Sequence, residues 1–158
     1  MASDFYLKLD GIEGESRDKI HANEIELESW QFGVSNDGSR HGLSGGGTGK
    51  AHVQDISFSK LNDKASPNLF AYCTNHKDIP NAVISCYKAA GDQRVKYLEI
   101  KMTECIITSC QQSAGSGGIP MESGSLNFAG ITYIYTTQAT DQGPGGSVEW
   151  TWTVPEHA

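Results

Sequence analysis

The residues whose types could support catalysis gather in one glycine-rich segment, residues 38–50. Its last part, Gly47-Thr48-Gly49-Lys50, is similar to the end of a phosphate-binding loop. That loop requires glycine at position 44 and Ser or Thr at position 51, followed by a helix, whereas this chain has Ser44 and Ala51 and continues as a strand. Consecutive backbone amides could still hold an anion, but the pattern does not predict a nucleotide site.

The same segment contains a formal match to the nucleophile elbow of hydrolases, formed by Gly42, Ser44 and Gly46. That motif works because a strand–turn–helix geometry presents a strained serine beside an oxyanion hole. Here glycine and polar residues flank the serine and no helix follows. The pattern therefore favours a chance match in a Gly/Ser loop, and a serine hydrolase acting through Ser44 is the third hypothesis.

Histidine and cysteine show no spacing typical of a metal site, because no two histidines are separated by three residues, as they are in an H-x-x-x-H pair. Cys73 and His76 could offer two ligands, with Cys86 as a remote third, but a histidine at a helix end near a buried thiol is the favoured interpretation. No C-x-x-C pair is present, so reduced thiols in or near the core are expected, although four cysteines could by count pair as disulfides. The histidines are His21, His41, His52, His76 and His157, and the cysteines are Cys73, Cys86, Cys105 and Cys110.

The composition of the chain excludes several classes of binding function. The chain has 158 residues, which suits one domain, and 12 basic against 19 acidic residues give a net charge of −7. Nucleic-acid and anionic-membrane binding both need clustered cations, so neither is expected. No apolar run approaches the length of a membrane span, and the residues after Met1 do not form a secretory signal peptide. We expect no cofactor and no catalytic site, while the 18 glycines stand out.

Hydrophobic residues alternate along most of the chain, which predicts an all-β fold. The phase of the alternation changes at Glu28-Ser29 and again at Ala129-Gly130, and each change indicates a bulge or a bend. Several bulged strands favour a bent sheet that closes into a compact β-barrel. The seven expected strands cover residues 5–9, 24–35, 52–60, 82–87, 95–110, 125–138 and 148–154.

A single helix is expected over residues 66–73. Ser66 is predicted as the N-cap and Pro67 as the first helical residue. Leu69, Phe70 and Cys73 would share one face, with which the helix plugs an open part of the barrel. No linker divides the chain, so residues 1–158 are predicted to form a single domain.

Three stretches of sequence resemble one known family, and they occur in its order. The first comprises residues 5–9, 11–16 and 19–21, the second residues 25–27, 29–33, 49–50 and 53–58, and the third residues 60 and 63–69. Residues 126–129 and Trp150 match more loosely. Together these motifs resemble the haemolysin co-regulated protein (Hcp) family, the tube subunit of bacterial type VI secretion.

The resemblance implies a β-barrel with one short helix, six copies of which close into a ring. Rings would stack into a hollow tube inside a contractile sheath, capped by a spike protein of the valine-glycine repeat family and expelled with effectors. Synthesis in the bacterial cytoplasm and export by the apparatus to the extracellular space or a target cell would explain the missing signal peptide. A ring-shaped carrier holding small effector proteins in its lumen is the alternative. A toxin domain is not expected, because the chain ends at Ala158, just after its last strand.

The resemblance also implies two sites. Alternation places Trp30, Phe32 and Val34 in the barrel wall, so that Gln31 faces outward into the lumen, where it could contact effectors. The long glycine-rich segment corresponds to the extended loop of the family, which reaches the neighbouring ring. The residues of this inter-ring loop are Gly38, Ser39, Arg40, His41, Gly42, Leu43, Ser44, Gly45, Gly46, Gly47, Thr48 and Gly49.

Overall fold

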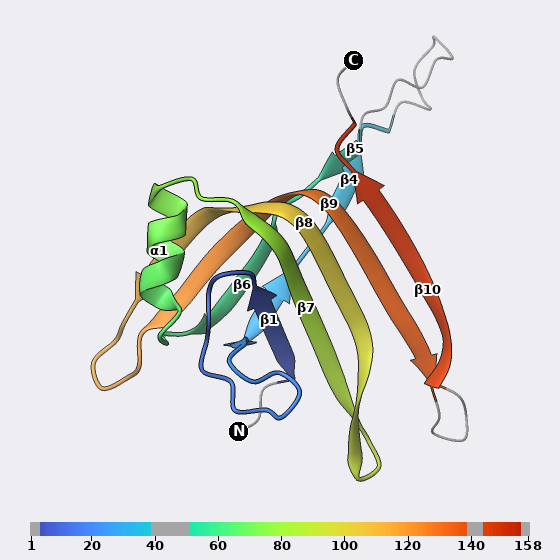
Figure 1. Ribbon diagram of the computed structural model, residues 1–158, viewed down its shortest axis with the longest axis horizontal. Coiled ribbons are helices and arrows are strands. Elements are labelled where there is room, and N and C mark those ends of the chain that lie inside the picture. Colours follow the sequence, from blue (N-terminus) through green and yellow to red (C-terminus); the bar gives the residue numbers. More distant parts are fainter. Residues whose placement is uncertain (1–3, 39–50, 139–143, 156–158) are drawn as a thin grey trace.

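The computed structural model describes residues 4–38, 51–138 and 144–155. One bent antiparallel sheet curls into a nearly closed barrel, and a short helix covers part of it (Figure 1). The helix is α1 (Ser66–Thr74). The strands are β1 (Phe5–Leu9), β2 (Ile25–Leu27), β3 (Ser29–Gln31), β4 (Val34–Asn36), β5 (Ala51–Val53), β6 (Ile56–Leu61), β7 (Ile79–Ala90), β8 (Gln93–Ser113), β9 (Met121–Gln138) and β10 (Pro144–Thr153).

The barrel closes through the connectivity of the chain. The hydrogen-bonded strand order is β2-β1-β7-β8-β9-β6-β3, so the two outermost strands of the sheet are consecutive in sequence. Only Glu28 separates them, and its amide donates to the carbonyl of Ser59 at 2.8 Å. The bend predicted at Glu28-Ser29 is confirmed, because it takes the chain from one edge of the sheet to the other.

Side chains from alternate positions fill the barrel. In β2, Ile25 and Leu27 are buried on either side of the exposed Glu26, as alternation predicts. The phase change expected at Ala129-Gly130 is confirmed, since Gly130 and Ile131 are both buried. A Cβ at Gly130 would lie 2.6 Å from the hydroxyl of Thr103, so any larger residue there would require the Thr103 side chain or the strand to shift.

The segment after β3 differs from the prediction. The expected strand over residues 24–35 is three strands, and the expected strand over residues 52–60 is two. The chain leaves the barrel at Gly33, whose carbonyl accepts from the Gln54 amide at 3.0 Å, and β4 then pairs only with β5 as a separate hairpin. Val34 is therefore 50% exposed, and its predicted place in the barrel wall is wrong.

The N-cap of the helix lies one residue earlier than predicted. Ala65 is the N-cap, with no side-chain cap, and Ser66 lies inside the helix with its hydroxyl buried. Leu69 is fully buried and faces the sheet as expected, but Phe70 is 37% exposed and does not belong to the core. Ser66 was predicted as a cap from its type, whereas its hydroxyl is used in a buried polar contact described below.

Strand β9 belongs to two parts of the sheet. Its first half, residues 121–126, pairs with β6, while its second half, from residue 130 onward, pairs with β10. Strand β8 lies along the other side of both halves. Within the described residues β10 has no partner except β9, so β10 forms an overhang at the outer edge of the sheet (Figure 1).

Candidate functional site

The row of side chains that contains Gln31 is uncharged and polar, and the carboxylate of Asp55 adjoins it through the hydroxyl of Thr108. Gln31 is exposed at the end of β3, opposite Ser57 of β6, which lies in turn opposite Ser125 of β9. Directly opposed residues share a face, so these three side chains form one row on the outside of the barrel. The neighbouring row also carries hydroxyl groups: those of Ser29 and Ser59 are hydrogen-bonded to each other at 2.6 Å. The outward orientation predicted for Gln31 is consistent with this geometry.

On the overhang formed by β10, the face that carries Trp150 is apolar. Phe32, Val34, Tyr133 and Trp150 line a shallow depression of about 400 Å³. The ring of Phe32 lies 6.2 Å from that of Trp150, and Trp150 remains 38% exposed. Val148, two residues earlier on the same face, is 67% exposed. These five residues are called the overhang patch, and clustered exposed apolar side chains of this kind mark interaction sites.

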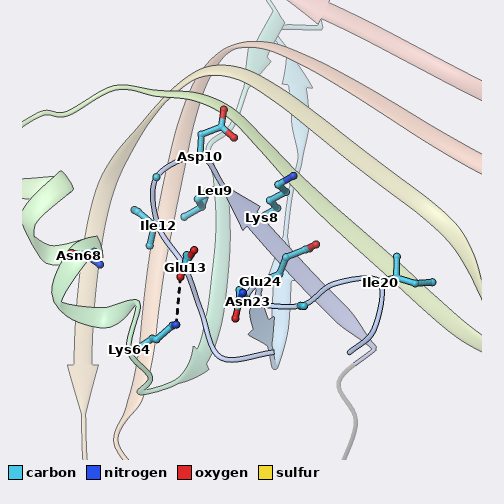
Figure 2. A pocket seen from close by; sticks show the side chains of 12 residues that line it. Lys8, Leu9, Asp10, Ile12, Glu13, Ile20, Asn23, Glu24, Lys64 and Asn68 are labelled. Carbon is cyan, nitrogen blue, oxygen red and sulfur yellow. Dashed lines mark ion pairs between the residues drawn. The ribbon is translucent and has the colours of Figure 1, made fainter. Parts of the chain in front are cut away.

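A polar groove lies between the segment after β1 and the approach to α1 (Figure 2). It encloses about 720 Å³. Each of its three carboxylates already has a partner: Glu13 pairs with Lys64 at 3.5 Å, Asp10 accepts from Asn81 at 3.0 Å, and Glu24 lies 2.9 Å from His21. The groove therefore presents no convergent pair of free acid–base groups.

A buried ionic network holds the start of α1 against the sheet. The side chains of Lys60 and Glu122 are fully buried and directly opposite each other on β6 and β9, with 3.2 Å between Nζ and Oε2. Lys60 Nζ also donates to Asp63 at 2.7 Å and to the Ser66 hydroxyl at 3.1 Å. Ser66 donates in turn to Glu122 Oε2. A buried charge is tolerated only when it is paired and hydrogen-bonded, as Lys60 is here.

The sequence analysis did not identify this network, although a signal was present. Ile56, Phe58 and Lys60 alternate in the same phase, so the lysine falls on the core face. Its partner Glu122 shares a phase with Leu126 on β9. Residues this far apart in sequence meet only through the sheet topology, and pairing them requires the order of the strands to be known.

A second cluster holds the segment between β1 and β2. The rings of Tyr6 and His21 stack with centroids 4.7 Å apart, and His21 also contacts the hydroxyl of Tyr87 through Nε2. Arg94 donates to the Tyr6 hydroxyl at 3.0 Å and pairs with Asp18 at 3.3 Å. The cluster links the ends of β1, β7 and β8 to the connecting segment.

Electrostatics in this cluster follow from burial and pairing. Burial raises the pKa of Tyr6 and the pKa of Tyr87, so both phenols stay protonated. Desolvation also acts to raise the pKa of Asp18, but the amides of Ile20 and His21 and the guanidinium of Arg94 outweigh it, and the pKa of Asp18 is lowered. A phenol held protonated beside a paired carboxylate is a structural contact, since neither group is poised to exchange protons near neutral pH.

The cysteines are free thiols, as predicted. Cys86 and Cys105 are buried in the core, where desolvation raises the pKa of each to about 12, while Cys73 and Cys110 are half-buried. Cys86 belongs to the core cluster beneath the sheet. Among the described residues no group of three side chains could hold a metal ion, and the possible set of Cys73, His76 and Cys86 is not assembled.

The predicted inter-ring loop is described only at its start. Gly38 follows β4, and a Cβ there would meet open space. Residues 39–49 lie outside the described residues. No helix in the described part of the chain is long and apolar enough to cross a membrane.

Comparison with known proteins identifies the family. The model of the family described as "Type VI secretion system effector, Hcp" matches residues 6–135 of this chain. The chain belongs to the Hcp family. Protein hcp1 of Pseudomonas aeruginosa is 40% identical over 160 aligned residues, which cover 99% of this chain and 98% of that protein.

Solved Hcp structures share the fold. A type six secretion system protein superposes with a TM-score of 0.87 at 29% identity, covering 96% of both chains. Hcp1 from Salmonella typhimurium superposes with a TM-score of 0.80 at 34% identity, covering 97% of this chain and 95% of that one. The nearly closed barrel with one short helix, expected from the sequence, is thus the Hcp fold.

Membership in the Hcp family decides between the function classes. Hcp proteins are structural, non-enzymatic proteins of the type VI secretion system and are secreted by it. The hydrolase hypothesis based on Ser44 is therefore wrong.

Proposed function

We propose that the chain, as a single domain over residues 1–158, is a tube subunit that closes into a six-membered ring. The observation that carries the proposal is the overhang, in which β10 has one edge unpaired within the described residues and carries Val148 and Trp150 of the exposed overhang patch. An unpaired edge is a template for another strand, and soluble proteins normally shield one. A neighbouring subunit would pair with β10 and cover the overhang patch, in a head-to-tail contact that closes after six copies.

The polar row containing Gln31 would then line the lumen. Uncharged hydroxyl and amide groups stay hydrated and neither attract nor repel a passing protein by net charge. Such a wall suits the second function kept open from the sequence, a carrier that holds small effector proteins inside the ring. Gln31 supports this role because it is the longest side chain of its row.

Rings would stack through the glycine-rich segment. By family resemblance, residues 38–49 reach the adjacent ring, and the β4–β5 hairpin supports this because it projects from the barrel on the side away from α1 (Figure 1). The stacked tube would bear a spike protein of the valine-glycine repeat family and lie within a contractile sheath. The subunit would be made in the cytoplasm and exported to the extracellular space or a target cell.

Particle mass and shape test the ring. Native mass spectrometry of the purified full chain should give a species of six times the 17.1 kDa subunit mass, and negative-stain electron microscopy should show annular particles. A protein that stays monomeric at high concentration by both methods would overturn the proposal.

Effector levels test the lumen. Gln31→Trp should lower the abundance of co-expressed effectors several-fold, because a bulky ring in each subunit obstructs the wall that binds them, while the ring itself persists. Asn68→Trp, an exposed change on α1, is the matched control and should leave effectors unchanged. Equal effector levels in the two variants would contradict a carrier role for Gln31.

A further inference from the structure

Two half-buried thiols lie where the helix covers the sheet. Cys73 is in the last turn of α1 and Cys110 is near the end of β8. Both are free, partly exposed and packed against the core, whereas Cys86 and Cys105 are fully enclosed. Helix α1 packs on β8, so the two accessible thiols belong to facing elements.

The path of the chain before and after α1 shows which part of β8 the helix lies against. The start of α1 is fixed beside Glu122 by the Ser66 hydroxyl, and Glu122 lies opposite Gln112 of β8. After the helix the chain rejoins the sheet at Ile79, opposite Cys105 of β8. The chain through α1 thus runs antiparallel to β8, from the level of Gln112 to that of Cys105.

Helix and strand spacing put the two cysteines at about the same level along β8. Cys73 follows Ser66 by two helical turns, a rise of about 10 Å, and lies on the same buried face. Counted along β8, about 10 Å from Gln112 is about three residues, which is the level of Ser109 and Cys110. Cys110 and Gln112 are two residues apart and share a face of the strand, and Gln112 reaches Glu122 beneath α1 with 3.2 Å between Nε2 and Oε2.

The electrostatics agree with this placement. Burial raises the pKa of Cys110 to about 11, and the negative charges of Glu122 and of a Cys73 thiolate contribute to the rise. A charge on one sulfur is therefore felt by the other.

We propose that Cys73 and Cys110 form a disulfide when the protein meets an oxidising thiol pool, which fastens α1 to β8. The co-reactant is a low-molecular-weight disulfide such as oxidised glutathione. The Cys73 thiolate attacks one sulfur of this reagent, forming a mixed disulfide and releasing one small thiolate. The Cys110 thiolate then attacks the Cys73 sulfur, and the second small thiolate leaves. The two cysteines are oxidised and the small disulfide is reduced to two thiols, which take up the two protons that the cysteines release.

The bond would not form in the reducing cytoplasm, because the glutathione pool there keeps such thiols reduced. Export by the secretion system carries the protein out of that pool, so the bond would mark exported subunits. The chemistry is intrinsic to the chain and does not depend on the ring proposal.

Intact mass and peptide mapping test the pairing. The full-length protein, kept native and incubated with oxidised glutathione, should become roughly 2 Da lighter as two hydrogens leave. After denaturation and alkylation, the Cys73 and Cys110 peptides should be linked and Cys86 and Cys105 alkylated. The rate should rise about tenfold per pH unit between pH 7 and 9, because Cys110 is mostly protonated in that range.

Cysteine variants distinguish a disulfide between Cys73 and Cys110 from other oxidation products. Cys110→Ser should stop at the glutathione adduct of Cys73, whereas Cys105→Ala should still form the link. The oxidised wild type should unfold at a temperature higher by roughly 5–10 °C than the reduced form. Four alkylated cysteines, a stable glutathione adduct in the wild type, or a link between other cysteines would each overturn the proposal. Mapping of the wild type decides the matter even if a variant does not fold.

Discussion

Replacing Lys60 by methionine should lower the free energy of unfolding by about 3–5 kcal/mol, one of the two largest effects expected for this protein. The substitution keeps an unbranched side chain of similar length but removes the ammonium. Glu122 would then be a carboxylate in a fully buried position without its cation, and Asp63 would lose its 2.7 Å partner. Urea unfolding followed by tryptophan fluorescence measures the change. Wild type and variant must be compared at the same protein concentration, because ring association would add to the apparent stability.

A second substitution distinguishes charge from packing. The double variant Lys60→Met/Glu122→Met removes both buried charges, so it should regain much of the stability lost in Lys60→Met, since an apolar pair of similar volume is often as stable as a buried ion pair. If Lys60→Met alone costs less than about 1 kcal/mol, or if the double variant is the less stable of the two, the network does not hold α1 as described.

Replacing Trp150 by aspartate should abolish the ring. A carboxylate placed on the overhang patch would be buried without a partner in every joint, and a cost of about 3 kcal/mol per joint weakens each contact roughly a hundredfold. Sedimentation velocity should therefore show monomers in place of rings, and far-ultraviolet circular dichroism should show that the barrel remains folded.

Neighbouring residues provide the controls for the ring joint. Thr151→Asp adds the same charge to β10 on the opposite face, and rings should persist. Val148→Asp is the more conservative probe, because Val148 is 67% exposed and contributes little to the monomer. Rings that survive both Trp150→Asp and Val148→Asp would place the joint elsewhere on the barrel.

The strands of the barrel and the bend at Glu28 could be predicted from the sequence, because alternation records which side of a strand is buried. The β4–β5 hairpin could not: Val34 continues the alternation of Trp30 and Phe32, and nothing local shows that its partner strand lies outside the barrel. The roles of Ser66 and Lys60 were missed for a related reason. Both depend on Glu122, which β9 brings to them from more than 50 residues away.

The candidate site was predictable only in part. The exposure of Gln31 follows from alternation, whereas the overhang patch brings Phe32 together with Tyr133 and Trp150, which lie about 100 residues or more further along the chain. Whether an apolar face is covered depends on which strands pair with it. Local sequence shows that Trp150 lies on an apolar face but not that the barrel leaves this face uncovered.

The connectivity that closes the barrel also sets a condition on synthesis. β1 pairs with β7, and β6, which pairs with β3, also pairs with β9, so these contacts join segments that are far apart in the sequence. Pairings of such high contact order form slowly. A nascent chain that has not yet reached β9 leaves β6 with one neighbour and cannot seal the core. In the proposed ring, the same strand order would exclude truncated products, because a chain that ends before β10 has no overhang with which to contact its neighbour. The fold would then ensure that only subunits containing β10 enter the ring.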